Sequence, residues 1–369
     1  MNRNKAEHLR ILRNYLRWCS GADGKSDSSI VKYENDISNF SKFLGTKSYK
    51  NITISLIEEY KSNLFNSGVS ISTYCSRLRN IRKFLSWLSN RRGYKRALTA
   101  YKISFMNSTD AQREMAQHPK VRNLQSMNFI LQLHDSIPDD NPLGMRDRAA
   151  ISALITTGIR HKAIISLPLG CVNSDKNYIH QDPLKGCQTK RSKSFKSVIC
   201  NIDERFNKSI RNWEHYLRSN GFGDLDPFIP RARLVNDKDS YCYCESTEVV
   251  PEYWKSHRSL SDLLRKRCQQ AGLPYLAPHN FRHILVKHVK ELDLSPMERK
   301  CFSQSLGHEH ERTTWNYGKF NDDEVISAVS KIYFQKKAPS NSVTEADKRN
   351  TAHSLAGKRQ VILQRNWRN

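Results

Sequence analysis

The sequence has no apolar run of about 18 residues, which is the length that a transmembrane helix needs, so we predict no membrane span. Its N-terminal residues carry basic side chains throughout and lack the apolar core of a signal peptide. The nine cysteines are odd in number and follow no disulfide spacing. We therefore predict reduced thiols in a cytoplasmic protein.

A metal-binding pattern is also missing. Cys242 and Cys244 are separated by a single residue, and neither a second cysteine pair nor a histidine pair follows them at zinc-finger spacing. We predict no metal site and no cofactor.

Acidic residues are few relative to basic ones. The 369 residues include 61 lysines and arginines against 36 aspartates and glutamates, a formal net charge of +25. Solubility needs far less charge, so this excess predicts a polyanionic partner, with nucleic acid as the first candidate. The alternative is a basic protein whose charge only keeps it in solution, and clustering of the charge weakens that alternative.

Helical periodicity dominates the first third of the chain. Apolar residues recur at helical spacing through residues 28–90, and a leading helix is expected near residues 4–19. We predict a helical N-terminal domain over residues 1–100.

The rest of the chain is predicted to hold a second domain. Residues 101–126 lose the periodicity and are predicted to be a linker, and residues 127–335 to form a domain that is mainly helical. Short strands are expected around residues 178–180 and 197–199, and a basic tail follows at residues 336–369. The predicted fold class is thus mainly α with a small antiparallel β-sheet.

One segment of the N-terminal domain carries charge of a single sign. Residues 77–96 hold eight basic side chains and no acidic one, whereas a merely solvated helix face usually mixes both signs. This pattern favours contacts with DNA phosphates. The side chains that we expect to make them are Arg77, Arg79, Arg82, Lys83, Arg91 and Arg92.

An arginine follows a buried helix in the second domain. The apolar helix that includes residues 149–155 is expected to stop at Gly158, because glycine readily adopts the left-handed conformation of a helix end. Arg160 then stands at the start of the next segment. A guanidinium held there can grip a phosphate through two hydrogen bonds.

A basic turn is expected between the two short strands. Lys190 is placed at its tip, and a lysine ammonium beside a departing alkoxide can serve as a general acid. Lys193 is the alternative for this role and an expected DNA contact, and Lys185 is a third candidate. The same lysines could instead serve only to contact DNA.

Three further motifs follow in order. His279 and Arg282 lie three residues apart at the start of an expected helix, which puts them on one face. Next comes the sequence Leu-Gly-His ending at His308, and then Tyr317 nine residues later. Each histidine or tyrosine alone is more often structural, whereas the ordered set supplies phosphate clamps, proton carriers and a phenol nucleophile.

This ordered set resembles the tyrosine recombinase, or phage integrase, family. The resemblance covers most of residues 127–335, and residues 28–90 resemble its helical core-binding domain more loosely. It implies a SAM-like N-terminal domain and an α+β catalytic domain. The turn of residues 181–195 is similar to integrases of transposon-like mobile elements, which implies a bacterial or phage element and a nucleoid-associated protein.

The resemblance implies a mechanism. Tyr317 attacks the scissile phosphate and forms a 3′-phosphotyrosyl bond, and Lys190 protonates the leaving 5′-oxygen. Arg160 and Arg282 stabilise the phosphate charge. The roles implied for the two histidines are proton transfer at the tyrosine (His279) and a hydrogen bond to the phosphate (His308).

The resemblance also implies partners. Family members work as four protomers on two double-stranded recombination sites and need no metal or cofactor. Accessory DNA-bending proteins or a second recombinase are further partners that it allows. One departure is Ala163, which stands where the family often has an acidic residue. Another is the position of the lysine, which is offset by about one residue from the commonest family spacing before Val198 and keeps Lys193 as an alternative to Lys190.

Two other functions share these features. A DNA-binding accessory protein would use the same basic surfaces without cutting, and a type IB topoisomerase-like enzyme would use the same chemistry without exchanging partners. The complete set of catalytic residue types favours the recombinase.

Overall fold

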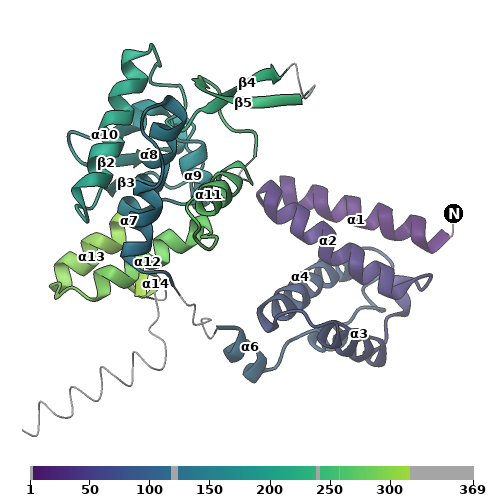
Figure 1. Cartoon of the computed structure of the whole chain (residues 1–369). Coiled ribbons are helices and arrows are strands. Elements are labelled where there is room, and N and C mark those ends of the chain that lie inside the picture. The colour runs from purple at the N-terminus through teal and green to yellow at the C-terminus, as the bar shows by residue number, and fades with distance from the viewer. Residues whose placement is uncertain (1–2, 118–123, 238–241, 257, 316–369) are drawn as a thin grey trace, which may run out of the picture. The chain divides into compact units, whose positions relative to one another are not determined.

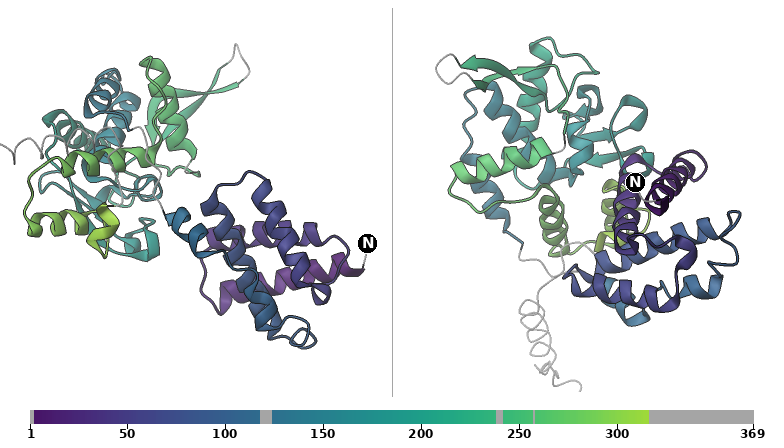
Figure 2. Two further views of the ribbon diagram at one scale, coloured as in Figure 1. Left: turned by 90° about the horizontal axis from the view of Figure 1, so that it is seen from below. Right: turned by 90° about the vertical axis from the view of Figure 1, so that its right-hand side faces the viewer.

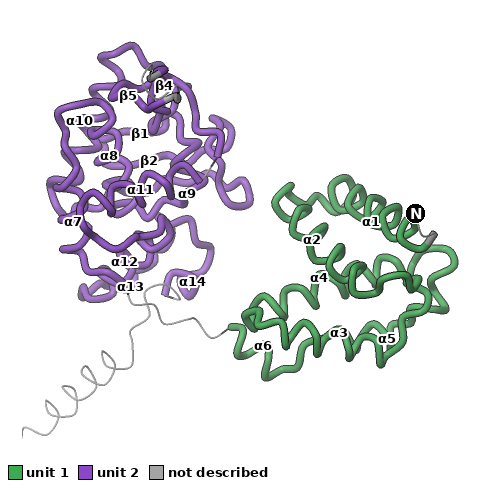
Figure 3. Tube along the Cα trace, turned by 45° about the vertical axis from the view of Figure 1, so that its right-hand side comes forward, with its two compact units in different colours: residues 1–120 green, residues 121–369 purple. Residues whose placement is uncertain are grey.

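The computed structural model describes residues 3–117, 124–237, 242–256 and 258–315. The chain divides into two compact units, Met1–Lys120 and Val121–Asn369 (Figure 3). No helix in these described ranges is both long enough and apolar enough to cross a membrane.

Unit 1 is a helical bundle, as the periodicity predicts. Thr53 and Ser70 cap two of its helices, since their hydroxyls accept hydrogen bonds from backbone N–H groups three residues later. Aromatic side chains such as Tyr15, Phe40 and Phe84 fill its core. Its helices are α1 (Arg3–Gly21), α2 (Asp27–Leu44), α3 (Ile54–Asn66), α4 (Ile71–Ser89), α5 (Ala100–Ser104) and α6 (Asp110–Gln117), with a 3-10 turn at Tyr49–Asn51 (Figure 1).

The predicted linker of residues 101–126 is partly wrong. Helices α5 and α6 both fall within unit 1, where α6 packs against α4 and the Cys75 thiol contacts the Gln112 carbonyl at 3.5 Å. Ile103 and Met106 are buried in the core of this unit. Two buried residues in a polar segment give too short a periodic signal to be read as a packed helix.

Unit 2 is built around helix α8, which is buried along nearly all its length. Helices α10 and α12 pack against it (Figure 1). Its helices are α7 (Met127–Asp135), α8 (Pro142–Thr157), α9 (His161–Ile165), α10 (Glu204–Ser219), α11 (Arg258–Gln270), α12 (Pro278–Lys290), α13 (Pro296–Ser305) and α14 (Glu311–Trp315).

A three-stranded antiparallel sheet, ordered β1-β2-β3, confirms the predicted strand region. Its strands are β1 (Val172–Asn173), β2 (Tyr178–Gln181) and β3 (Phe195–Val198). Residues Tyr178 and Val198 are Cα partners at one end of the β2–β3 register, and Gln181 and Phe195 at the other. The connection between β2 and β3 contains a short 3-10 turn, Lys190–Ser192.

A second antiparallel pair was not predicted. Strands β4 (Arg231–Asp237) and β5 (Cys242–Val250) form a hairpin that extends from the helices of unit 2 (Figure 2), in a region expected to be helical. Leu234 and Val235 are adjacent and both substantially exposed, at 48% and 43%. Adjacent exposed apolar residues such as these break the alternation of apolar and polar residues that would indicate a strand.

Candidate active site

The junction between α8 and α9 presents Arg160 as the sequence predicts. Gly158 caps α8 in the left-handed conformation, with φ +59°, and a Cβ there would lie 2.8 Å from a methyl carbon of Leu306. Arg160 is the N-cap residue of α9 and is half-buried. Its guanidinium makes no hydrogen bond or ion pair with other residues in the described ranges, so its donors can bind a phosphate.

Arg282 is buried in α12 and joins three segments. Its guanidinium donates to the carbonyl oxygens of Gly158 at 2.7 Å and Leu306 at 2.6 Å, and one nitrogen lies 2.7 Å from His308 Nε2. Only 2% of Arg282 is exposed. The arginine therefore ties the end of α8 to the Leu-Gly-His motif, and the two predicted residues Arg282 and His308 touch.

The charges of three other predicted catalytic residues act on the ring of His308. Burial is the largest cause that lowers the pKa of His308 to about 3, and the positive charges of Arg282, Arg160 and Lys190 lower it further. Charges act on one ring in this way only when they lie near it. Four of the six predicted catalytic residues thus lie near one another, and the imidazole is neutral at neutral pH.

The low pKa of His308 predicts a pH effect on stability. From its ordinary pKa of 6.5 down to about 3, the unfolded chain binds a proton here that the folded protein does not, so the free energy of unfolding falls as pH falls. One proton is worth about 1.4 kcal/mol per pH unit. We expect His308→Gln to lose stability less steeply from about pH 6 to about pH 4, as measured by denaturant titration. Equal slopes would contradict the low pKa.

The lysine turn lies beside the same site. Lys190 is exposed, and its charge acts on His308. Lys193 instead forms an ion pair with Glu309, and Arg191 lies 3.6 Å from the same carboxylate. The structure thus gives the two lysines different surroundings, since Lys193 is paired with a carboxylate and Lys190 lies close enough to His308 for its charge to act there.

Contacts that sequence reasoning missed hold this turn in place. The Ser197 hydroxyl donates to the Ser305 carbonyl at 2.7 Å, and the Ser305 hydroxyl accepts from the Val198 N–H at 2.8 Å, so β3 is tied to the end of α13. A Cβ at Gly307 would lie 2.4 Å from the Phe195 ring, so only glycine fits between the strand and His308. Serines and a phenylalanine carry no sequence signal for such contacts.

His279 lies in the first turn of α12, three residues before Arg282, and is exposed. Its ring packs edge-on against His283, with centroids 5.0 Å apart. Tyr317 lies outside the described residues. Helix α14 ends two residues before it and is held by a hydrogen bond of 3.0 Å from Lys290 Nζ to the Trp315 carbonyl.

The basic segment of unit 1 does not form one uniform face. Arg77 pairs with the buried carboxylate of Asp36 at 3.5 Å, and Lys83 pairs with Asp23, so acids remote in sequence neutralise two of the six expected DNA contacts. Arg79 and Arg82 are exposed and line a groove between α4 and α5. Arg91 and Arg92 are also exposed, with the Arg91 guanidinium 4.5 Å from the centre of the Trp87 ring.

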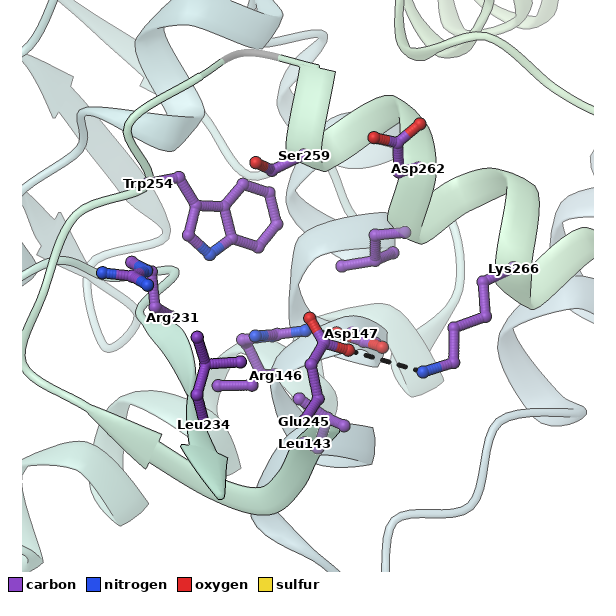
Figure 4. A pocket seen from close by; sticks show the side chains of 12 residues that line it. Leu143, Arg146, Asp147, Arg231, Leu234, Glu245, Trp254, Ser259, Asp262 and Lys266 are labelled. Atoms are coloured by element: carbon purple, nitrogen blue, oxygen red, sulfur yellow. Dashed lines mark hydrogen bonds and ion pairs between the residues drawn. The ribbon is translucent and has the colours of Figure 1, made fainter. Parts of the chain in front are cut away.

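A cavity of about 340 Å³ lies elsewhere in unit 2, between the β4–β5 hairpin and α11 (Figure 4). Beneath it, Asp147 accepts hydrogen bonds from Arg146 at 2.9 Å and Arg267 at 2.7 Å. Lys266 reaches Glu245 across it at 3.4 Å. None of the predicted catalytic residues that the structure describes lines this cavity, so it is separate from the candidate site.

Comparisons with known proteins identify the family of this chain. Residues 125–324 match the family model described as the phage integrase family, and residues 12–92 match the phage integrase N-terminal SAM-like domain. The chain is 22% identical over 325 residues to the tyrosine recombinase XerD of Rickettsia conorii, covering 86% of this chain and 97% of that protein.

Solved structures share the fold. A lambda integrase dimer bound to a COC′ core site aligns with a TM-score of 0.57 and 14% identity, over 84% of this chain and 77% of that one. A lambda integrase tetramer bound to a Holliday junction aligns with a TM-score of 0.56 and 13% identity, over 85% and 79%. Because the first family model covers more than half of the 369 residues, the chain belongs to the phage integrase family and is a site-specific recombinase of the tyrosine type.

Proposed function

We propose that this recombinase cuts DNA through a covalent 3′-phosphotyrosyl bond to Tyr317 and that it integrates or excises a mobile element. The observation that carries the chemistry is the contact of Arg282 with the buried His308 at 2.7 Å, close enough to Arg160 and Lys190 for their positive charges to act on the same ring. Guanidinium and ammonium groups fixed at one point can stabilise the charge that develops on a phosphate during displacement.

The proposed cleavage step is a displacement at phosphorus. The phenol oxygen of Tyr317 forms a bond to phosphorus while the bond from phosphorus to the 5′-oxygen breaks. The phenol proton passes to His279 or to water at the exposed end of α12, and Lys190 gives a proton to the 5′-oxygen. Arg160 and Arg282 hold the non-bridging oxygens. Because the fixed positive charges come from side chains, we propose that the step needs no divalent metal.

The assembly proposed is four protomers on two DNA sites. The fold shared with lambda integrase, which has been seen as a tetramer on a Holliday junction, supports this arrangement. The similarity of residues 181–195 to integrases of transposon-like elements supports the choice of a mobile element.

DNA binding is expected to depend strongly on salt. If each protomer neutralises about 8 phosphates, a plot of log affinity against log salt concentration has a slope near −7, because each contact releases condensed counterions. Fluorescence anisotropy with a labelled duplex over a salt series measures this slope. A flat response would contradict the assignment of the exposed arginines of unit 1 and the lysine turn to phosphate contacts.

A two-site plasmid assay tests the proposed function. The DNA ends that flank the element are placed around a marker, and excision is scored by amplification across the rejoined junction. We expect excised circles with wild type and none with Tyr317→Phe. Occupied sites without cutting would favour the accessory DNA-binding protein, and relaxation of plasmids that lack the sites would favour a topoisomerase-like enzyme.

A further inference from the structure

A buried chain of hydrogen bonds stands behind His308. His308 Nδ1 lies 2.7 Å from the hydroxyl of Thr314, and that hydroxyl donates to the hydroxyl of Ser303 at 2.7 Å. Thr314 is 0% exposed and Ser303 is 2% exposed, so water does not compete for these bonds. Arg282 contacts the opposite ring nitrogen.

The chemistry of these groups fixes where the imidazole proton lies. A guanidinium can only donate, so His308 Nε2 accepts from Arg282 and carries no proton. The single proton of the neutral ring is therefore on Nδ1 and is donated to Thr314. In the DNA-free protein the chain runs from Arg282 through His308 and Thr314 to Ser303.

With its proton on Nδ1, His308 cannot donate a hydrogen bond from Nε2 to a phosphate. A phosphate oxygen only accepts hydrogen bonds, so His308 can bind it only with a proton on Nε2. Because the ring is neutral, Nδ1 must then accept a hydrogen bond instead of donating one. A carboxylate or carbonyl behind the ring would only accept and would lock the proton on Nδ1, whereas a hydroxyl can serve either way.

We propose that Thr314 and Ser303 are positioning residues that allow His308 to reverse its tautomer when a phosphate enters the site. The inference rests on the proposed function, in which His308 donates to the scissile phosphate. The N–H bond at Nδ1 breaks and one forms at Nε2, and both protons are exchanged with water where the His308 ring, 8% exposed, reaches the surface of the site, so the ring stays neutral. The Arg282 N–H that Nε2 had accepted turns to donate to the phosphate. The Thr314 hydroxyl then turns to donate to Nδ1, and the Ser303 hydroxyl turns to donate to Thr314.

Two substitutions at residue 314 separate the hydroxyl from the shape of the side chain. Thr314→Val keeps the shape and removes the hydroxyl, whereas Thr314→Ser keeps the hydroxyl and removes a methyl group. We expect Thr314→Val to slow single-turnover cleavage by about 10- to 100-fold, and Thr314→Ser to stay within about three-fold of wild type. Affinity for DNA should change less than about three-fold in both.

A role in packing alone predicts the opposite order. The serine variant would then be the more damaged, because it leaves a cavity in a buried site, and the valine variant would cleave at the wild-type rate. Thermal melting of both variants shows whether they fold. Ser303→Ala should fall between the two in rate, since it removes only the second member of the chain.

Nitrogen-15 NMR of histidine-labelled full-length protein reads the tautomer directly, with His308→Gln identifying the signal. We expect the Nδ1-protonated form without DNA and the Nε2-protonated form when Tyr317→Phe protein binds its DNA site. Persistence of the Nδ1 form in that complex would overturn the inference. Absence of cleavage by wild type would refute the proposed function instead, because the NMR measurement does not depend on cleavage.

Discussion

Arg160→Ala and Arg282→Ala are each expected to slow strand cleavage by about 30- to 1000-fold, which corresponds to a loss of about 2 to 4 kcal/mol of transition-state stabilisation. The positive charges of both guanidiniums lower the pKa of His308, so both lie near it. Each is expected to contact a different oxygen of the phosphate. Single-turnover cleavage of a duplex that contains the recombination site measures the effect. Arg265→Ala, an exposed arginine on α11, is the matched control for loss of one positive charge.

The two variants should differ in stability. Arg282→Ala leaves the carbonyls of Gly158 and Leu306 without their donor in a buried site, and each such group costs about 1–3 kcal/mol. Arg160 is half-buried, and its side chain bonds to no other residue in the described ranges, so Arg160→Ala should melt near the wild-type temperature. Normal cleavage by either variant would place the phosphate elsewhere.

Tyr317→Phe is expected to abolish cleavage and leave DNA binding intact. The substitution removes one oxygen atom, which is the proposed nucleophile, and phenylalanine has no group that could replace it. Gel-shift and cleavage assays on the same duplex measure both properties. The affinity should stay within about three-fold of wild type, since no phosphate contact is removed.

Tyr275→Phe is the matched control, because Tyr275 is an exposed tyrosine of the described part of unit 2 and has no predicted catalytic role. It is expected to cleave at the wild-type rate. Cleavage by Tyr317→Phe at that rate would remove Tyr317 from the mechanism and would require another nucleophile.

Much of the candidate site can be predicted because its signals depend on residues that are close together in the sequence. Gly158 ends α8 in the left-handed conformation, which glycine adopts without the steric cost of a Cβ, and Arg160 is thereby placed at the start of α9. Arg282 and His308 were predicted from spacing, and they meet through a contact of 2.7 Å. The helices of unit 1 carry an apolar stripe and capping hydroxyls, which are signals that depend on neighbouring residues only.

The remaining features depend on contacts between residues distant in sequence. The pairing of Arg77 with Asp36 joins two helices, so one basic residue of a segment that has no acids of its own is neutralised in the fold. The bonds of Ser197 to Ser305 and of Thr314 to Ser303 involve small hydroxyls with no distinctive pattern. The side chains of the β4–β5 hairpin whose burial the structure describes are mostly exposed, so they produce no alternation of apolar and polar residues.

Covalent capture tests the central claim most directly. Wild type and Tyr317→Phe are expressed beside their flanking DNA and denatured in SDS, and the attached DNA and the modified peptide are then identified. We predict an adduct with wild type alone, in which a DNA 3′-phosphate is joined to Tyr317. An adduct on another residue, or none from wild type that occupies its sites, would contradict the proposed tyrosine chemistry.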